Sequence, residues 1–301
     1  MFNAMTRAEI WLQDTLDKPL GIEDLANHLG YSASQVRRQF RHCFNISPSA
    51  YREKRRLERA AVLLSLTSQN IAQIAIRCGY TNHSSFSRAF QRRYRMSPRE
   101  YRQAVSSLYL LNRPNKKLTI SIERNRPAHV VLMRLYQAPD HIPGLGSTKY
   151  HANHLGHLQT LLETSTPTMV LPDLLTEKVT ATVEEPAPNH TRTDIGLYLE
   201  NRNTAKYLAL PVNYRRVDIP SRYYAKIYFD NISQLSYIMS ETLVALMDEK
   251  KRLNISGDAP QVLWHPHHIE LRIPLSAYPV GIILYPLSSN QNRHFWLEMP
   301  V

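Results

Sequence analysis

Serine and arginine side chains recur at the spacing of one helix face in two short segments of the 301-residue sequence. Residues at i, i+3, i+4 and i+7 lie on the same side of an α-helix, so each set would form one polar face. The paired N–H groups of arginine suit O6 and N7 of guanine, whereas serine and glutamine bond to several bases. This chemistry favours contact with base edges in DNA. The first face consists of Ser34, Arg37, Arg38 and Arg41, and the second of Ser84, Ser87, Arg88 and Gln91, preceded by His83.

Two alternatives to base contact remain open for these faces. A solvated helix surface has the same spacing of polar residues as a surface that binds DNA. Arg38 and Arg88 also occupy matching positions in the two segments. Such a match would equally arise if both arginines had a shared role in the fold, or if both contacted phosphate.

Both segments belong to an internal repeat, in which Ile22–Arg52 matches Ile71–Arg102. Each copy has a short helical pattern, a turn with Gly-Tyr, and a second helical pattern that begins after a good N-cap residue. A short helix, a glycine-containing turn and a second helix make up the helix-turn-helix motif, whose second helix enters the major groove. We therefore expect two such units, at residues 22–45 and 71–94.

The net charge of the chain is +12, and the first 117 residues carry all of it. A basic domain joined to a neutral one is typical of a nucleic-acid-binding protein with a second module. Part of the excess lies between the two repeats, where basic side chains encircle a predicted helix, so only some of them can contact phosphate. The candidates for phosphate or secondary contacts are Arg41, Arg55, Arg56, Arg59 and Gln91.

Composition and motifs exclude several classes of protein. No apolar run approaches the ~18 residues of a membrane span, and the N-terminal residues lack the pattern of a secretory signal. The two cysteines, Cys43 and Cys78, cannot form a disulfide framework or a four-cysteine zinc site. No nucleophile elbow, phosphate loop or metalloprotease motif is present. We therefore expect a cytoplasmic, nucleoid-associated protein that is not an enzyme and has no cofactor.

The second repeat resembles the signature of the AraC/XylS family of transcription regulators. Between Ile71 and Phe90 it contains I-A-x-x-x-G-Y-x-x-x-S-x-F-x-R-x-F, and the family's S-P-x-x-Y-R follows at Ser97–Arg102. The family commonly has glycine shortly before the Ser-Pro pair, where this chain has Asn45 and Arg95. Because arginine adopts the left-handed conformation poorly, we expect the second unit to end differently from the first.

The resemblance implies a bacterial, sequence-specific regulator that binds an asymmetric promoter site in double-stranded DNA, and an activator that contacts RNA polymerase. The order of the domains resembles that of Rob-like members of the family. Because two units in one chain can read two groove segments, we expect the protein to bind DNA as a monomer. By position, the resemblance assigns base reading to Ser34, Arg37, Arg38, His83, Ser84, Ser87 and Arg88.

After Thr119 the pattern changes to short runs of β-branched and aromatic residues, with helical patterns near Thr148–Glu163 and Ile232–Lys251. This order predicts an α+β domain with two strand-helix-strand-strand halves, which resembles the GyrI-like fold. The expected boundaries are residues 1–105 for an all-α, AraC-type DNA-binding domain, 106–118 for a linker and 119–301 for a GyrI-like effector-binding domain. The expected strands are His129–Tyr136, Ile195–Leu199, Tyr223–Phe229, Ile269–Ile273, Val280–Tyr285 and Phe295–Met299.

The second domain is rich in aromatic residues, which commonly line pockets for small molecules but also fill ordinary cores. GyrI-like domains often place a glutamate against cationic ligands. The closest phrase here is Gln261–Pro266, with Val262 and Leu263 where that glutamate would be, so we do not expect a preference for cations. The candidate effector pocket consists of Tyr136, Tyr198, Tyr228, Trp264 and Trp296.

Two other roles for the second domain were weighed against effector sensing. One is a protein-interaction module without a ligand, used for polymerase contact, partner docking or control of turnover. The other is a metal sensor, because histidines recur at every third position in one segment and cluster in another. Three ligands at i, i+3 and i+6 converge poorly on a helix, so we expect no metal site. These histidines are His151, His154, His157, His265, His267 and His268.

Overall fold

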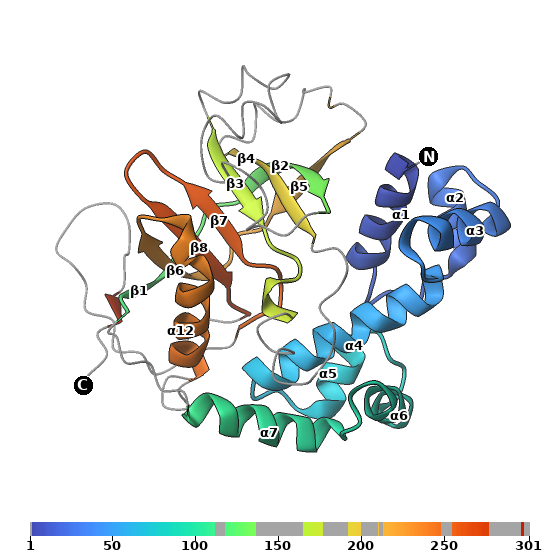
Figure 1. Ribbon diagram of the computed structural model, residues 1–301, viewed down its shortest axis with the longest axis horizontal. Coiled ribbons are helices and arrows are strands. Elements are labelled where there is room, and N and C mark those ends of the chain that lie inside the picture. The colour runs from blue at the N-terminus through green and yellow to red at the C-terminus, as the bar shows by residue number, and fades with distance from the viewer. Residues whose placement is uncertain are drawn as a thin grey trace. The chain divides into compact units, whose positions relative to one another are not determined.

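The computed structural model describes residues 2–111, 118–136, 165–176, 192–199, 210, 213–247, 255–276 and 296–297. The chain divides into two compact units, Met1–Ser106 and Ser107–Val301. The first unit is helical, and the second is built on one antiparallel sheet (Figure 1). Across these ranges, no helix combines the length and the apolar character that crossing a membrane would require.

The first unit contains two helix-turn-helix pairs joined by a long helix (Figure 1). Helices α2 and α3 form the first pair, and α5 and α6 form the second. Helix α4 contacts α1 and α3 as well as α5 and α6, so it belongs to both halves of the unit. The bounds are α1 (Phe2–Asp14), α2 (Ile22–Leu29), α3 (Ala33–Phe44), α4 (Pro48–Leu66), α5 (Ile71–Arg77), α6 (His83–Tyr94) and α7 (Pro98–Leu111).

Side-chain caps fix the start of the second helix in each pair. Ser32 Oγ accepts a hydrogen bond from the Gln35 amide, and Gln35 Oε1 accepts one from the Ser32 amide at 3.0 Å, which completes a capping box. In the second pair, Asn82 Oδ1 accepts from the Ser85 amide at 2.8 Å. Both caps agree with the sequence-based prediction.

An edge-to-face pair of aromatic rings occupies the same place in the core of each half. The rings of Phe40 and Tyr51 are 5.5 Å apart at 70°, and those of Phe90 and Tyr101 are 5.3 Å apart at 81°. All four side chains are buried. Such pairs stabilise a core beyond the apolar area that they bury. The repeat in the sequence is therefore a repeat of core packing.

The arginine after each of these tyrosines holds the loop that leads into the helix-turn-helix pair. Arg52 Nη1 donates to the Leu20 carbonyl, and its Nη2 donates to Thr15 Oγ1 at 3.1 Å. Arg102 Nε donates to the Leu64 carbonyl at 3.2 Å, and its Nη2 donates to the Gln69 carbonyl at 2.6 Å. The two arginines thus have a shared structural role, because each donates to at least one main-chain carbonyl near the start of the pair.

The two recognition-type helices end in the same way, contrary to the prediction from their sequences. Asn45 and Arg95 both adopt the left-handed conformation, with φ of 56° and 58°. Their amides donate to the carbonyls of Arg41 and Gln91, both at 2.9 Å. Ser97 then caps α7 together with Glu100. These contacts on both sides hold Arg95 in a conformation that its side chain disfavours.

Gly30 and Gly79, in the two Gly-Tyr turns, both have positive φ, at 73° and 78°. A Cβ on Gly30 would meet nothing within 4 Å. A Cβ on Gly79 would clash with the Leu16 carbonyl oxygen and lie 2.7 Å from Arg56 Nη2. The turn of the second pair therefore packs directly against the loop after α1 and against α4, and only a glycine permits this approach.

The second unit has a nine-stranded antiparallel sheet with the order β5-β2-β4-β3-β7-β8-β6-β1-β9 in the described residues. Helix α12 (Leu235–Met247) follows a short 3₁₀ turn and confirms the helical pattern predicted there. The other predicted helix, near Thr148–Glu163, and the strand Val280–Tyr285 lie outside the described residues. The strands are β1 (Ile120–Arg124), β2 (Ala128–Leu135), β3 (Thr166–Val170), β4 (Thr193–Leu199), β5 (Tyr214–Ile219), β6 (Tyr223–Phe229), β7 (Gln261–Trp264), β8 (Ile269–Pro274) and β9 (Trp296–Leu297).

The order of the strands is duplicated about the centre of the sheet. In one half β2 pairs with β4 and β4 with β3, and in the other β6 pairs with β8 and β8 with β7. The halves join where β3 pairs with β7, and they exchange their leading strands, since β1 pairs with β6 and β5 with β2. The crossing turns are bonded together through Asn125, whose Oδ1 accepts from the Arg222 amide at 2.9 Å. The described strands thus form two topologically equivalent halves.

Replacing Gly79 by alanine should destabilise the protein more than replacing Gly30. Either change places a Cβ at positive φ, which costs about 1–2 kcal/mol, but only the change at Gly79 adds a clash with neighbouring atoms. We expect the free energy of unfolding to fall by about 1 kcal/mol for Gly30→Ala and by at least about twice as much for Gly79→Ala. Urea denaturation followed by circular dichroism measures both, and equal losses would contradict the proposed close approach.

Replacing Arg102 by alanine should loosen the start of α5. Hydrogen bonds from a charged donor to buried carbonyls contribute about 1.5–3 kcal/mol, and Arg102→Ala removes two of them. Arg99, on the same helix, is exposed, so Arg99→Ala is the matched control and should change stability by less than about 0.5 kcal/mol. Hydrogen exchange read by mass spectrometry on peptides from residues 60–80 should speed up in the first variant alone. Unchanged protection there would argue against the role of Arg102.

Candidate nucleic-acid interface

Helix α3 buries one face and exposes the polar residues predicted to meet DNA. Val36 and Phe40 are fully buried in a core shared with α1 and α2. The opposite positions on a 3.6-residue helix therefore face solvent. The exposed residues of this face are Ser34, Arg37, Arg38 and Arg41.

Helix α6 repeats this division between a buried and an exposed face. Phe86 and Phe90 are fully buried, and the rings lie 5.6 Å apart. Ser87 is half-buried, with its Oγ 3.5 Å from His83 Nε2. The other predicted residues on this face, which are all exposed, are His83, Ser84, Arg88 and Gln91.

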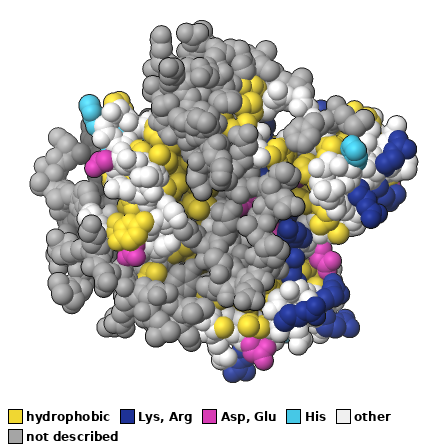
Figure 2. Space-filling view, viewed as in Figure 1, with side chains coloured by type: hydrophobic (Ala, Val, Ile, Leu, Met, Phe, Trp, Pro, Cys, Tyr) yellow, Lys and Arg dark blue, Asp and Glu magenta, His cyan; other side chains and the backbone are white. Residues whose placement is uncertain are grey.

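The arginines on the two exposed faces are available for contact with a ligand. Within the described part of the chain, Arg38, Arg41 and Arg88 have no hydrogen bond or ion pair. Arg37 Nη2 lies 3.6 Å from Glu23 Oε1, but both side chains are more than half exposed, so this ion pair is weak. Figure 2 shows lysine and arginine side chains gathered over α3 and α6. These groups can bind an anion without first breaking a strong internal contact.

The surroundings of Arg38 and Arg88 test whether these two arginines share a structural role in the fold. A shared structural role like that of Arg52 and Arg102 would require hydrogen bonds or ion pairs with the rest of the unit, and neither side chain has one among the described residues. Arg52 and Arg102 have that role instead. The repeated Tyr-Arg pair was the signal in the sequence that could have identified them. Contact with bases and contact with phosphate both remain compatible with Arg38 and Arg88.

The basic run on α4 is largely engaged inside the protein. Arg56 Nε donates to the Leu16 carbonyl at 2.7 Å, and its Nη2 donates to the Lys18 carbonyl at 3.2 Å. Arg55 pairs with the buried carboxylate of Glu58, as Lys54 and Arg93 also do. These contacts account for Arg55 and Arg56 without DNA. Arg59 is half-buried on the same helix.

The two cysteines do not form a reactive centre in this unit. Cys78 is fully buried at the end of α5, and burial raises the pKa of its thiol to about 12. A thiol with so high a pKa stays protonated near neutral pH and is a poor nucleophile. Cys43 is a free cysteine of intermediate exposure on α3.

The aromatic residues predicted to form one effector pocket are spread over the second unit. Tyr198 packs in a cluster with Leu263, so Trp264, the next residue along β7, faces the opposite side of the sheet. Tyr228, which is 42% exposed, lies on β6, and three strands separate β6 from β4 in the sheet. Tyr136 follows the end of β2, and the side chain of Trp296 lies outside the described residues. Among the described side chains, Tyr198 and Trp264 therefore lie on opposite faces of the sheet and do not line one pocket together.

A buried cluster of charges, missed in the sequence, lies on the same face as Tyr198. Glu270 accepts two hydrogen bonds from Arg272, at 2.7 and 3.1 Å, and lies 3.2 Å from Lys226 and 2.9 Å from His265. Burial would raise the pKa of Glu270, but these partners outweigh it and hold that pKa well below its usual range. The Arg272 guanidinium lies 4.8 Å from the centre of the Tyr198 ring.

The carboxylate of Glu270 is neutralised by the cationic side chains around it. Glu270 already has cationic partners, so no bare carboxylate remains to attract a positive ligand. The signal in the sequence was the E-L-R of β8, in which two charged residues share one face of a strand. The rings of His265 and His268 stack at 4.7 Å. Among the described residues, however, no group of histidine, cysteine or carboxylate side chains could hold a metal ion.

Comparison with known proteins places the first unit in a large group of bacterial regulators. A family model described as "Helix-turn-helix domain" matches residues 25–104. The putative HTH-type transcriptional regulator YkgA of Escherichia coli K12 is 38% identical over 106 residues, which cover 33% of this chain and 44% of YkgA. The Right origin-binding protein of the same organism is 35% identical over 95 residues, 32% of this chain and 33% of that protein.

A third relative is matched over most of its own length. The regulatory protein SoxS of E. coli K12 is 37% identical over 95 residues, which are 32% of this chain and 89% of SoxS. The match to the first two relatives spans less than half of their length, and it falls in the helical unit of this chain. The similarity thus concerns the helix-turn-helix unit. On this similarity and on the motifs of its first unit, the chain belongs to the AraC/XylS family of helix-turn-helix transcription regulators.

Proposed function

We propose that this protein binds specific DNA sequences through α3 and α6 and thereby regulates transcription. One observation carries the proposal: two capped helices expose matching arginines that have no partner in the described part of the chain. A recognition helix of a helix-turn-helix motif presents its N-terminal residues to base edges in the major groove. The position of the whole net charge in residues 1–117 supports the same function.

In this proposal the seven residues near the start of the two helices read bases. The bidentate fork of Arg38 and Arg88 suits guanine, and the shorter polar side chains suit several bases. Residues one turn further along each helix contact phosphate, which positions the helix without specifying sequence. The proposed base-reading residues are Ser34, Arg37, Arg38, His83, Ser84, Ser87 and Arg88. The proposed phosphate contacts are Arg41 and Gln91. We expect a smaller contribution to affinity from Arg55, Arg56 and Arg59.

The proposal includes activation of transcription by a monomer that contacts RNA polymerase. Both helix-turn-helix units belong to one chain, so a single copy presents two recognition helices to one asymmetric site. The family supplies the expectation of activation. Transcription in vitro with purified RNA polymerase, on promoters found by genome-wide mapping of bound sites, tests it. Repression at all of them would contradict it.

We further propose that the second unit is a GyrI-like domain that senses a small molecule. The duplicated strand order supports the fold. Two buried atoms support a ligand: Gln261 Oε1 and Arg272 Nη1 have no hydrogen-bond partner among the described residues, and these residues are paired across β7 and β8. An acceptor beside a donor suits an uncharged group that carries both, such as an amide, on an amphipathic molecule.

Arg38 and Arg88 should each affect specificity as well as affinity. Arg38→Ala or Arg88→Ala should weaken binding to the specific site by about 1–3 kcal/mol and relax the preference at one base pair. The matched control is Arg38→Lys, which keeps the charge but loses the bidentate fork. If Arg38 reads a base, lysine should restore little of the specificity. Binding to the specific site and to random DNA is measured by fluorescence anisotropy.

The salt dependence of the same measurements separates the two kinds of contact. Wild-type affinity should fall steeply with salt, and loss of one phosphate contact should reduce the slope of log K against log [salt] by about 1. An equal loss on specific and random DNA in Arg38→Ala would identify Arg38 as a phosphate contact. A flat salt dependence of the wild type would contradict the proposed interface.

Gln261→Leu should stabilise the ligand-free protein and weaken its response to the effector. An unsatisfied buried acceptor costs about 1–3 kcal/mol, and an apolar side chain of similar shape removes that cost. Thermal unfolding of the full chain, with and without a panel of amphipathic amides, measures both effects. The control is Gln261→Glu, which keeps an acceptor. Stability and ligand response that are the same in Gln261→Leu and in the wild type would argue against this site.

A further inference from the structure

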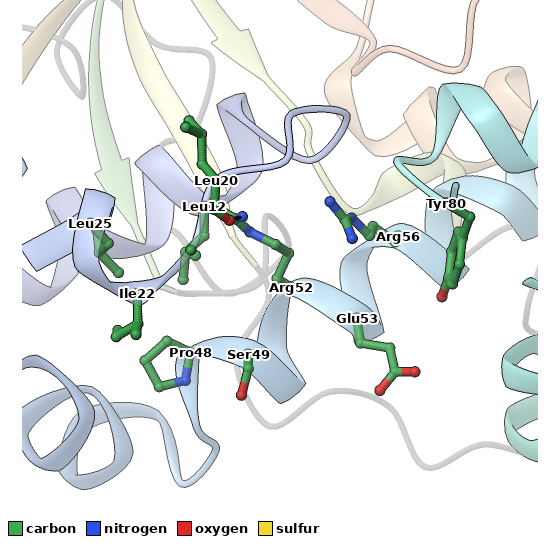
Figure 3. A pocket seen from close by; sticks show the side chains of 11 residues that line it. Leu12, Leu20, Ile22, Leu25, Pro48, Ser49, Arg52, Glu53, Arg56 and Tyr80 are labelled. Atoms are coloured by element: carbon green, nitrogen blue, oxygen red, sulfur yellow. Dashed lines mark hydrogen bonds between the residues drawn. The ribbon is translucent and has the colours of Figure 1, made fainter. Parts of the chain in front are cut away.

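A half-open cavity of about 280 Å³ lies in the first unit, lined mainly by α1, the first helix-turn-helix pair and α4, and by Tyr80 of the second pair. Figure 3 shows its lining side chains, which come from α1, the start of α2, the first half of α4 and the turn before α6. One part of the wall is apolar and includes Leu12, Ile22 and Leu25. The volume is close to the lower end of the range for small-molecule sites, about 300 Å³.

Two polar groups on the wall of this cavity have no partner. Arg52 Nε and the hydroxyl of Tyr80 are both buried and make no hydrogen bond within the part of the chain that the structure describes. Arg52 is only 7% exposed, and its other nitrogens are held by the Leu20 carbonyl and Thr15 Oγ1. The Tyr80 ring lies edge-on against Phe86 at 5.3 Å. A buried polar group without a partner is costly, so its presence at a cavity points to an occupant that supplies the bond.

The charge around the cavity favours an anionic occupant. Arg52 and Arg56 contribute two positive charges, whereas Glu53, the acidic residue in the lining, is paired with Arg92 at 3.0 Å. Burial raises the pKa of Tyr80, and the nearby Glu53 adds to this rise. The Tyr80 hydroxyl therefore stays protonated and can donate a hydrogen bond. Both unpartnered groups are thus donors on residues that line the cavity.

We propose that this cavity binds a small organic carboxylate with an apolar body. The carboxylate accepts a hydrogen bond from Arg52 Nε–H, the body lies against Leu12, Ile22 and Leu25, and the Tyr80 hydroxyl bonds to a second polar group of the ligand. The site is distinct from the proposed effector site of the second unit, because all of its lining residues belong to Met1–Ser106.

An occupant of this cavity would contact the segments that precede both proposed DNA-reading helices. Ile22 and Leu25 belong to α2, which precedes α3, and Tyr80 belongs to the turn that leads into α6. Gly79 in the same turn packs against Arg56 and Leu16. Since the lining includes α2 of the first pair and Tyr80 of the second, a bound ligand adds contacts to both pairs and alters their spacing. Ligand and DNA binding are then coupled, and the coupling is reciprocal.

The binding site is tested with 3-phenylpropanoate as the probe, titrated into the full chain by isothermal calorimetry. Its uncharged amide, 3-phenylpropanamide, is the control for charge and should bind at least about tenfold more weakly. The blocking variant is Ser49→Trp, because Ser49 is exposed and lines the cavity. Its matched control is Ala50→Trp, at the next position of α4, which is exposed and outside the lining. Only Ser49→Trp should lose the probe.

The role of Tyr80 is tested with the hydroxylated probe 3-(4-hydroxyphenyl)propanoate. The added hydroxyl should improve binding by about threefold to tenfold in the wild type and give no gain in Tyr80→Phe, which removes one unpartnered oxygen. Thermal unfolding shows whether each variant is folded. A folded Ser49→Trp that binds the probe as the wild type does would place the probe elsewhere and overturn the proposal. The absence of binding to the wild type at about 1 mM probe would also overturn it.

Coupling is measured as the affinity for the specific DNA site with and without saturating probe. We expect a change of about fivefold or more in the wild type and in Ala50→Trp, and none in Ser49→Trp. An unchanged affinity in the wild type would show that the cavity is not coupled to DNA binding. The same change in Ser49→Trp would show that the coupling arises from another site.

Discussion

The contacts of Arg56 with the loop after α1 and with the turn at Gly79 link the two helix-turn-helix pairs. The Arg56 guanidinium bonds to the carbonyls of Leu16 and Lys18, in the loop after α1, while Gly79 of the second pair packs against the same groups. Without this contact, the two pairs would be connected only through helix α4. The lateral contact through Arg56 adds a second fixed point. Two recognition helices with a fixed spacing can then meet successive segments of one groove, which two independently moving units could do only at an entropic cost.

The helical unit was predicted well from the sequence because its signals are local. Caps at Ser32 and Asn82, the Ser-Pro pairs and the 3.6-residue periodicity act within a few positions along the chain. The repeat then showed twice over which positions are buried. The ending of α6 was predicted wrongly, because the cost of positive φ at Arg95 is a local preference. The hydrogen bond to Gln91 and the cap of the next helix outweigh that preference.

The second unit was harder to predict, because strand pairing is not local. The exchanged strands β1 and β5, and the short strands β3 and β7 at the centre, had no clear signal of their own. The face on which a strand residue lies depends on register, and a shift of one residue reverses it. Trp264 and Tyr198 were grouped by residue type, although alternation places them on opposite faces. The charged face of β8 was not predicted, because Glu270 and Arg272 are buried. Their ion pair offsets the cost of burying each charge.

Net charge alone overstates how many groups are available to bind DNA. Of the basic residues on α4, Arg52 and Arg56 satisfy main-chain carbonyls, while Lys54 and Arg55 neutralise the buried Glu58. Arginine suits both kinds of task, because its planar fork fits two carbonyls of a loop as well as a base or a phosphate. Residue type therefore cannot separate the two roles. What separates them is whether the fork already has partners inside the protein. By that criterion, among the described residues named here, the proposed contact with DNA rests on the arginines of α3 and α6 that have no partner. Most of the charge on α4 is used in contacts within the helical unit.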